Sequence, residues 1–271
     1  MKTNFKKVIE FNTCFNHKVS NEPYIKIFEN EPKLVTQRLA LIEEEINELK
    51  EAYDNNDIVE IIDALSDILY VAYGFCVCFG INIDEKFSEY MHLYLKENKV
   101  NKVIKVGNVS MEKLNSLTNY HKTQYIITML DDVKKYHINI KNNMYKTNLD
   151  MIMSYITEHF DNLTNSCNES NFQNITFDIF NVLKNTYLFG NQIGLDLDKS
   201  FTIVHDSNMT KICDTEELAI ETVNNYKQND NRYDSPSYKL TKFGYVIFNE
   251  STEKILKSIK YTPANFESLL N

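Results

Sequence analysis

The sequence predicts an all-α protein that contains one helical unit twice and ends in a small β-hairpin. No proline occurs between Pro32 and Pro236, so about two hundred residues lack the strongest helix breaker. Moving the chain by 114 residues also matches its second half to its first without a gap, mostly at apolar and turn positions. The clearest matches are Gly80 with Gly194, Asp84 with Asp198, Tyr73 with Tyr187, Phe87 with Phe201 and Leu69 with Leu183. We therefore expect a tandem-duplicated helical bundle, a pseudo-dimer within one chain.

Three helices are expected in the first copy. Residues 33–53 carry one apolar stripe with helical spacing, and the polar turn 54–57 follows it. Asp57 and Glu60 form an N-terminal capping pattern for a second helix, which runs to about Phe79 and ends at Gly80. Asp84 then opens a third helix through about residue 97.

These patterns divide the chain into four parts. Residues 1–98 form the first copy, 99–119 a polar connector, 120–212 the second copy and 213–271 a separate tail. Asp214 begins one more capped helix in the tail. Residues 245–249 and 254–259 flank the turn 250–253, and we expect them to form the β-hairpin.

Composition excludes several classes of protein. The net charge of −9 and a pI near 5.3 disfavour nucleic acid as the main partner. The glycines are too scattered to form a Rossmann or P-loop phosphate site. The longest apolar run, residues 68–81, is shorter than the roughly 20 residues that span a bilayer. The N-terminus lacks a signal sequence, and five cysteines without a C-x-x-C pair indicate no disulfide framework, so we expect a soluble, cytoplasmic protein with Cys76 and Cys78 in its core.

Acidic side chains gather on the first two helices. Glu44, Glu45 and Glu48 share one face, and none has a basic residue four positions later. On the second helix Glu60, Asp63 and Asp67 fall within about 60° on an otherwise apolar cylinder. The simplest alternative is a solvated acidic face. Buried carboxylates without basic partners instead favour a hard cation, so we expect all six to be ligands for Mg²⁺, with Mn²⁺ as a substitute.

The pattern Glu44-Glu45-Ile-Asn-Glu48 followed by Glu60-Ile-Ile-Asp63 resembles the E-E-x-x-E and E-x-x-D signature of the all-α nucleotide pyrophosphohydrolases. This superfamily includes MazG, phosphoribosyl-ATP pyrophosphohydrolase and the dimeric dUTPases. Residues 38–42, 63–74, 204–211, 213–217 and 257–263 resemble the phosphoribosyl-ATP pyrophosphohydrolase-like branch in particular.

The resemblance implies that the protein hydrolyses a nucleoside triphosphate to a monophosphate and pyrophosphate with Mg²⁺. It implies catalytic, metal-holding roles for Glu44, Glu45, Glu48, Glu60 and Asp63, with Asp67 as a further ligand or an orienting group. It also implies substrate-binding roles for Arg38, His205, Asn208, Lys211 and Lys257. His205 and Asn208 lie on the apolar side of their expected helix, where a buried polar pair beside a lysine suits phosphate.

The two copies differ in complementary ways. Glu45, Glu48, Glu60, Asp63 and Asp67 align with His159, Asn162, Asn174, Phe177 and Asn181, so the second copy lacks the acids. His205, Asn208 and Lys211 align with Met91, Tyr94 and Glu97. We therefore predict one composite nucleotide site per chain, in a pseudo-dimeric monomer or a homo-oligomer. Two alternatives stay open: a catalytically silent nucleotide-binding or scaffold protein, and a member specific for phosphoribosyl-ATP or dUTP.

Overall fold

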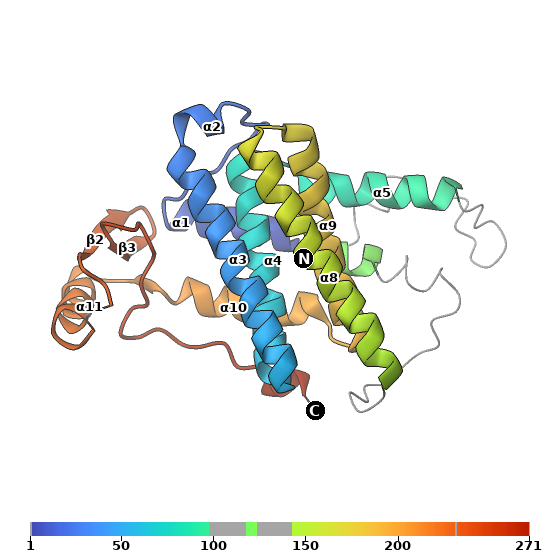
Figure 1. The fold of residues 1–271 in the computed structure, drawn as a ribbon. Helices are drawn as coiled ribbons and strands as arrows, with labels where there is room; N and C mark the ends of the chain where they lie inside the picture. Colours follow the sequence, from blue (N-terminus) through green and yellow to red (C-terminus); the bar gives the residue numbers. More distant parts are fainter. Residues whose placement is uncertain (1, 98–117, 124–142, 231, 271) are drawn as a thin grey trace.

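A computed structural model of the chain describes residues 2–97, 118–123, 143–230 and 232–270. Four long helices form its central bundle (Figure 1). They are α3 (Pro32–Asn55), α4 (Ile58–Phe79), α8 (Asn143–Asn168) and α9 (Phe172–Gln192). α3 packs against α4, α8 packs against α9, and α4 also contacts α9, so the two helix pairs share one interface. Most of the expected connector lies outside the described residues.

Local signals set the ends of α3 and α4. Pro32 opens α3, and Asn56 in a left-handed conformation ends it. The side chain of Asp57 then accepts hydrogen bonds from the backbone N–H groups of Val59 and Glu60. α4 ends at Gly80, whose φ of 69° favours glycine and whose position against the Glu22 carbonyl leaves no room for a Cβ. The two helices predicted from the sequence are confirmed.

Helix α4 is apolar because it is the core helix of the bundle. It is long and apolar enough to cross a membrane by length and composition, which the count of consecutive apolar residues did not reveal. However, 83% of its most apolar window is buried inside the protein. It contacts α1 (Asn4–Cys14), α3, α9 and α10 (Leu197–Met209), so its apolar surface is covered by other helices, as in a soluble protein.

The described residues 2–97 are called the first unit, and residues 118–123 and 143–209 the second unit; the last helix of each packs on the other. α10 lies across α4, and α5 (Ile83–Glu97) contacts α9. The sequence predicted both helices but not α1, which begins after an N-cap at Thr3. A short helix, α2 (Ile27–Asn30), links α1 to α3.

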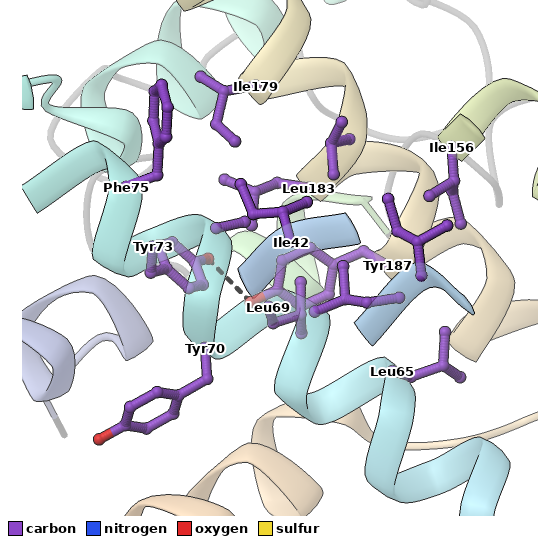
Figure 2. Close-up of a cluster of buried hydrophobic side chains, with 14 of the residues drawn as sticks. Ile42, Leu65, Leu69, Tyr70, Tyr73, Phe75, Ile156, Ile179, Leu183 and Tyr187 are labelled. Atoms are coloured by element: carbon purple, nitrogen blue, oxygen red, sulfur yellow. Dashed lines mark hydrogen bonds between the residues drawn. The ribbon is translucent and has the colours of Figure 1, made fainter. Parts of the chain in front are cut away.

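Buried polar side chains join the two units at equivalent positions. The hydroxyls of Tyr73 on α4 and Tyr187 on α9 lie 2.9 Å apart, as the dashed line in Figure 2 shows. Asn4 donates to Tyr187 Oη at 3.0 Å and to Asp198 Oδ1 at 2.8 Å. Asn119 donates to Tyr73 Oη and to Asp84 Oδ1, both at 2.9 Å. Each unit is thus held by an asparagine from the segment that precedes the other.

One hydrophobic core spans both units. Ile42, Leu65 and Leu69 meet Ile156, Ile179 and Leu183 in Figure 2. Cys76 and Cys78 are fully buried in this core, as the sequence predicted, and all five cysteines are free thiols.

The C-terminal part forms a three-stranded antiparallel sheet with one helix. Strand β1 (Ile212–Cys213), helix α11 (Glu216–Asn229), strand β2 (Pro236–Thr241) and strand β3 (Gly244–Asn249) follow in order, and the sheet order is β1-β3-β2. The predicted pairing was wrong in its partner, because β3 forms its hairpin with β2 rather than with residues 254–259. Those residues contribute only an isolated bridge between Phe248 and Ile255. The tail then returns to the bundle, where Phe266 is buried in the main core just before the short 3₁₀ helix η2 (Glu267–Leu269).

Candidate functional site

Helices α3 and α4 place the six acidic side chains along one shared interface. The helices are antiparallel because only a short turn joins them, and the charges of Asp67 and Asp63 on α4 act on Glu45 of α3. Glu44, Glu48 and Glu60 are exposed, whereas Glu45, Asp63 and Asp67 are half-buried. The set therefore has an inner row of half-buried carboxylates and an outer row of exposed ones.

The inner carboxylates repel one another in a poorly hydrated place. Burial and the nearby charges of Asp67 and Glu48 raise the pKa of Glu45 to about 9. Burial and Asp63 raise the pKa of Asp67 to about 7. Burial, followed by Glu60 and Glu48, also raises the pKa of Asp63. In the part of the chain that the structure describes, Glu45 Oε2 is buried without any hydrogen-bond partner, so this oxygen is open to a ligand.

Three lysines from the C-terminal third of the chain face these acids. Burial lowers the pKa of Lys211, which directly precedes β1, to about 8, and Asp67 opposes that shift. Lys257 counteracts the raised pKa of both Asp63 and Asp67. Lys254 Nζ lies 3.9 Å from Glu44 Oε1. The expectation that only metal ions balance the acids was therefore incomplete, because distant lysines do so in part.

The tail is fixed to α10 beside these lysines. Ser207 Oγ lies 2.9 Å from Tyr261 Oη and donates to the Thr262 carbonyl at 2.8 Å. Lys257 Nζ and Lys211 Nζ lie 4.7 and 5.9 Å from the centre of the Tyr261 ring. Sequence reasoning missed Tyr261 and Lys254, although Lys254-Ile-Leu-Lys257 places two lysines three residues apart. Their position depends on how the tail folds back, which no local pattern indicates.

His205 and Asn208 lie near Tyr70 of α4. His205 Nδ1 is 3.1 Å from Tyr70 Oη, and His205 Nε2 is 3.8 Å from Glu10 Oε2. Burial lowers the pKa of His205, which favours the neutral ring. Asn208 also hydrogen-bonds Tyr70, and Asp67 raises the pKa of this tyrosine after the larger effect of burial. The predicted pair thus reaches the acids through Tyr70, and direct contact with a substrate stays a prediction.

Arg38 is buried at the far end of the same helix face. It lies two helical turns, roughly 10 Å, before Glu45 on α3. Its Nη2 is 3.0 Å from His17 Nδ1, and burial and the Arg38 charge lower the pKa of His17 to about 3. A Cβ at Gly74 would lie 3.2 Å from Arg38 Nη1, so the glycine makes room for the guanidinium. Arg38 contacts a neutral imidazole, and its predicted role in substrate binding stays a prediction.

The aligned positions of the second copy have a different chemistry. His159, which aligns with Glu45, lies 3.4 Å from the buried carboxylate of Asp178. Asn181, which aligns with Asp67, accepts a hydrogen bond from Lys184 at 2.6 Å. Phe177, which aligns with Asp63, is 61% exposed. An imidazole, an amide and a phenyl ring do not form the oxygen-rich set that Mg²⁺ prefers.

The first copy fits a hard divalent cation by its chemistry. Its six donors are carboxylates, their charges repel one another, and one buried oxygen lacks a partner. Among the described residues, no three acidic side chains are close enough in their present rotamers to hold one ion.

Comparisons with known proteins agree with this site. The phosphoribosyl-ATP pyrophosphohydrolase family matches residues 8–91, which include all six acids. An uncharacterized protein of Acanthamoeba polyphaga mimivirus, L479, is 33% identical over 99% of this chain and 96% of its own length. No solved structure matches the chain significantly. The chain therefore belongs to one family with the mimivirus protein, and its residues 8–91 are a phosphoribosyl-ATP pyrophosphohydrolase domain of the MazG-like nucleotide pyrophosphohydrolase superfamily.

Proposed function

We propose that the protein is a Mg²⁺-dependent nucleoside triphosphate pyrophosphohydrolase. In this reaction water attacks the α-phosphorus, the bond between the α-phosphorus and the bridging oxygen breaks, and a nucleoside monophosphate and pyrophosphate leave. The observation that supports this proposal is that six carboxylates on α3 and α4 lie near three lysines, Lys211, Lys254 and Lys257. A triphosphate with bound Mg²⁺ has a positive part that the acids would bind and a negative part that the lysines would bind.

The acids and the lysines have different roles in this proposal. Bound Mg²⁺ supplies polarisation of phosphate oxygens and a water of lowered pKa. Glu44, Glu45, Glu48, Glu60 and Asp63 would hold the metal, and Asp67 would hold or orient it from the inner row. Lys211 and Lys257 would bind phosphate oxygens, and the charge that they supply acts most strongly where the site is poorly hydrated.

The proposal includes a single composite site built by two copies of one unit. Support comes from a second similarity, in which Thr3-Asn4-Phe5 and Lys7 correspond to Thr118-Asn119-Tyr120 and Lys122 at an offset of 115, one residue more than the offset of the helices. Lys7 Nζ lies 3.4 Å from Asn4 Oδ1, and Lys122 Nζ lies 3.3 Å from Asn119 Oδ1. Because α10 of the second copy crosses α4 of the first, Lys211 lies near acids that its own copy lacks.

The test is a screen of the common nucleoside triphosphates, with dUTP and phosphoribosyl-ATP, for pyrophosphate release with Mg²⁺. At least one should give pyrophosphate and the matching monophosphate in equal amounts. The Glu48→Gln variant is the matched control, since it keeps the size of the side chain and removes its charge. Nucleotide binding without turnover by the wild-type protein would instead support the silent, nucleotide-binding alternative.

A further inference from the structure

Several hydrogen bonds hold the turn after β3, which places Lys254 beside the acids. The amide Nδ2 of Asn249, which is 2% exposed, lies 2.9 Å from Asp234 Oδ1, 2.9 Å from Ser251 Oγ and 3.1 Å from Thr252 Oγ1, so its two N–H groups are shared among three acceptors. The backbone N–H of Asn249 also donates to the Lys254 carbonyl at 2.9 Å. These hydrogen bonds, made by a buried asparagine, hold the turn in its conformation.

Two further features fix the turn on helix α3. Gln37 Nε2 donates to the Thr252 carbonyl at 3.2 Å, and Glu44 lies two helical turns farther along the same face of α3. Glu253 has a φ of 58°, a left-handed conformation that is unfavourable for a residue other than glycine. The turn therefore keeps an unfavourable backbone conformation immediately before Lys254.

Lys254 itself remains free to move at its end. Its side chain is about half exposed, as is that of Glu44, and the 3.9 Å pair between them is a weak surface interaction. Lys254 is also close enough to Lys211 to disfavour the charged form of that lysine. The side chain of Lys254 is long and flexible, it is held only weakly by Glu44, and the ammonium group of Lys211 lies nearby. Lys254 can therefore turn from Glu44 toward an anion that binds between the two lysines.

We propose that Lys254 is a phosphate-binding residue that also acts as a temporary counter-ion for Glu44. In the metal-free protein its ammonium group balances Glu44. With Mg²⁺ and nucleotide bound, Glu44 would hold the metal, and Lys254 would move to an oxygen of the triphosphate beside Lys211 and Lys257. This role rests on the proposed function for its nucleotide step, whereas the competition with metal for Glu44 stands on the contact alone.

The test compares Lys254→Gln, Lys254→Arg and Lys260→Gln. Lys260 is exposed, lies on the same tail and is the matched control for a lost charge. Calorimetric titration of nucleotide-free protein with Mn²⁺ should show several-fold tighter binding by Lys254→Gln, because a competing cation has gone. Steady-state kinetics with the preferred nucleotide should show a KM raised about tenfold with little change in kcat, since one charged hydrogen bond is lost. Lys254→Arg should keep the wild-type KM, and Lys260→Gln should change neither quantity.

The opposite signs distinguish this role from a structural one. Weaker binding of both Mn²⁺ and nucleotide by Lys254→Gln, or no change in either, would overturn the proposal. If the wild-type protein hydrolyses no nucleotide, the proposed function fails, and the Mn²⁺ titration still decides whether Lys254 competes for Glu44.

Discussion

The hydroxyl groups of Tyr73 and Tyr187 lie 2.9 Å apart, and the two residues are separated by 114 positions, the offset at which the chain matches itself. The predicted duplication would place such a pair on a local twofold axis, as in a symmetric dimer. Both side chains are fully buried, and each hydroxyl also accepts a hydrogen bond from an asparagine. This contact joins α4 to α9 inside the core.

Removing either hydroxyl should weaken the same bond. Tyr73→Phe and Tyr187→Phe are each expected to lower the free energy of unfolding by about 1 kcal/mol, because a buried partner loses its hydrogen bond. The double variant should cost less than the sum, since the second substitution removes the partner that the first left unsatisfied. Denaturant unfolding of the four proteins measures this coupling. Strict additivity would show that the contact does not join the copies energetically.

Catalysis is expected to require a divalent metal. Pyrophosphate release should depend on Mg²⁺ or Mn²⁺ and stop on addition of EDTA, because carboxylates can bind substrate phosphates only through a cation. Ion chromatography of the products separates pyrophosphate from orthophosphate. Orthophosphate as the first product would contradict the assigned reaction.

Single charge removals in the acid set should separate activity from stability. Glu48→Gln or Asp63→Asn should reduce turnover by several orders of magnitude, and the fold should survive or gain stability because fewer like charges repel. Kinetics and thermal unfolding of the metal-free proteins measure the two effects. Near wild-type turnover in both variants would show that the acids form an ordinary solvated face.

The stability of the metal-free protein should fall as pH rises. The pKa of Glu45 is raised to about 9 from an ordinary value near 4.5, so the folded protein keeps a proton that the unfolded chain has lost in this range. By linkage, the contribution of Glu45 to the free energy of unfolding is fully present below about pH 4.5 and decreases toward pH 9. Glu45→Gln should flatten the decrease, which thermal unfolding in EDTA would show as a higher melting temperature at pH 8 than the wild type. Equal pH profiles for the two proteins would contradict the raised pKa.

A single shared site predicts unequal effects from the two copies. Lys211→Ala should lower kcat/KM by about 10²-fold or more, the scale seen when one positioned donor is lost. His159→Ala, at the position that aligns with Glu45, should have almost no catalytic effect. Titration with a nucleotide should saturate at one molecule per chain. Two equivalent nucleotides per chain would reject the composite site.

Local chemistry made most of the helices predictable. Asp57 and Gly80 bracket α4 by capping and by a left-handed end, and these signals depend on a few adjacent residues. The hairpin was assigned to the wrong partner because residues 245–249 and 254–259 flank a polar turn, whereas the true turn lies before Gly244, at the start of β3. Residues 254–256 form only two backbone bonds with β3. The acid positions followed from helical spacing. The contact of Lys254 with Glu44 joins residues far apart in the sequence, and no local rule brings them together.

The contacts of α1 also bear on the order in which the protein can fold. Asn4 and Lys7 are buried, and their partners outside α1 are Tyr187, Asp198 and Thr202. These two side chains lack those partners until the chain has been made as far as residue 202, whereas Asn12 of the same helix contacts Cys78. Contacts between residues so far apart in the sequence slow folding, because a long loop must close before any bond rewards it. The polar contacts of Asn4 and Lys7 are therefore expected to form later than that of Asn12.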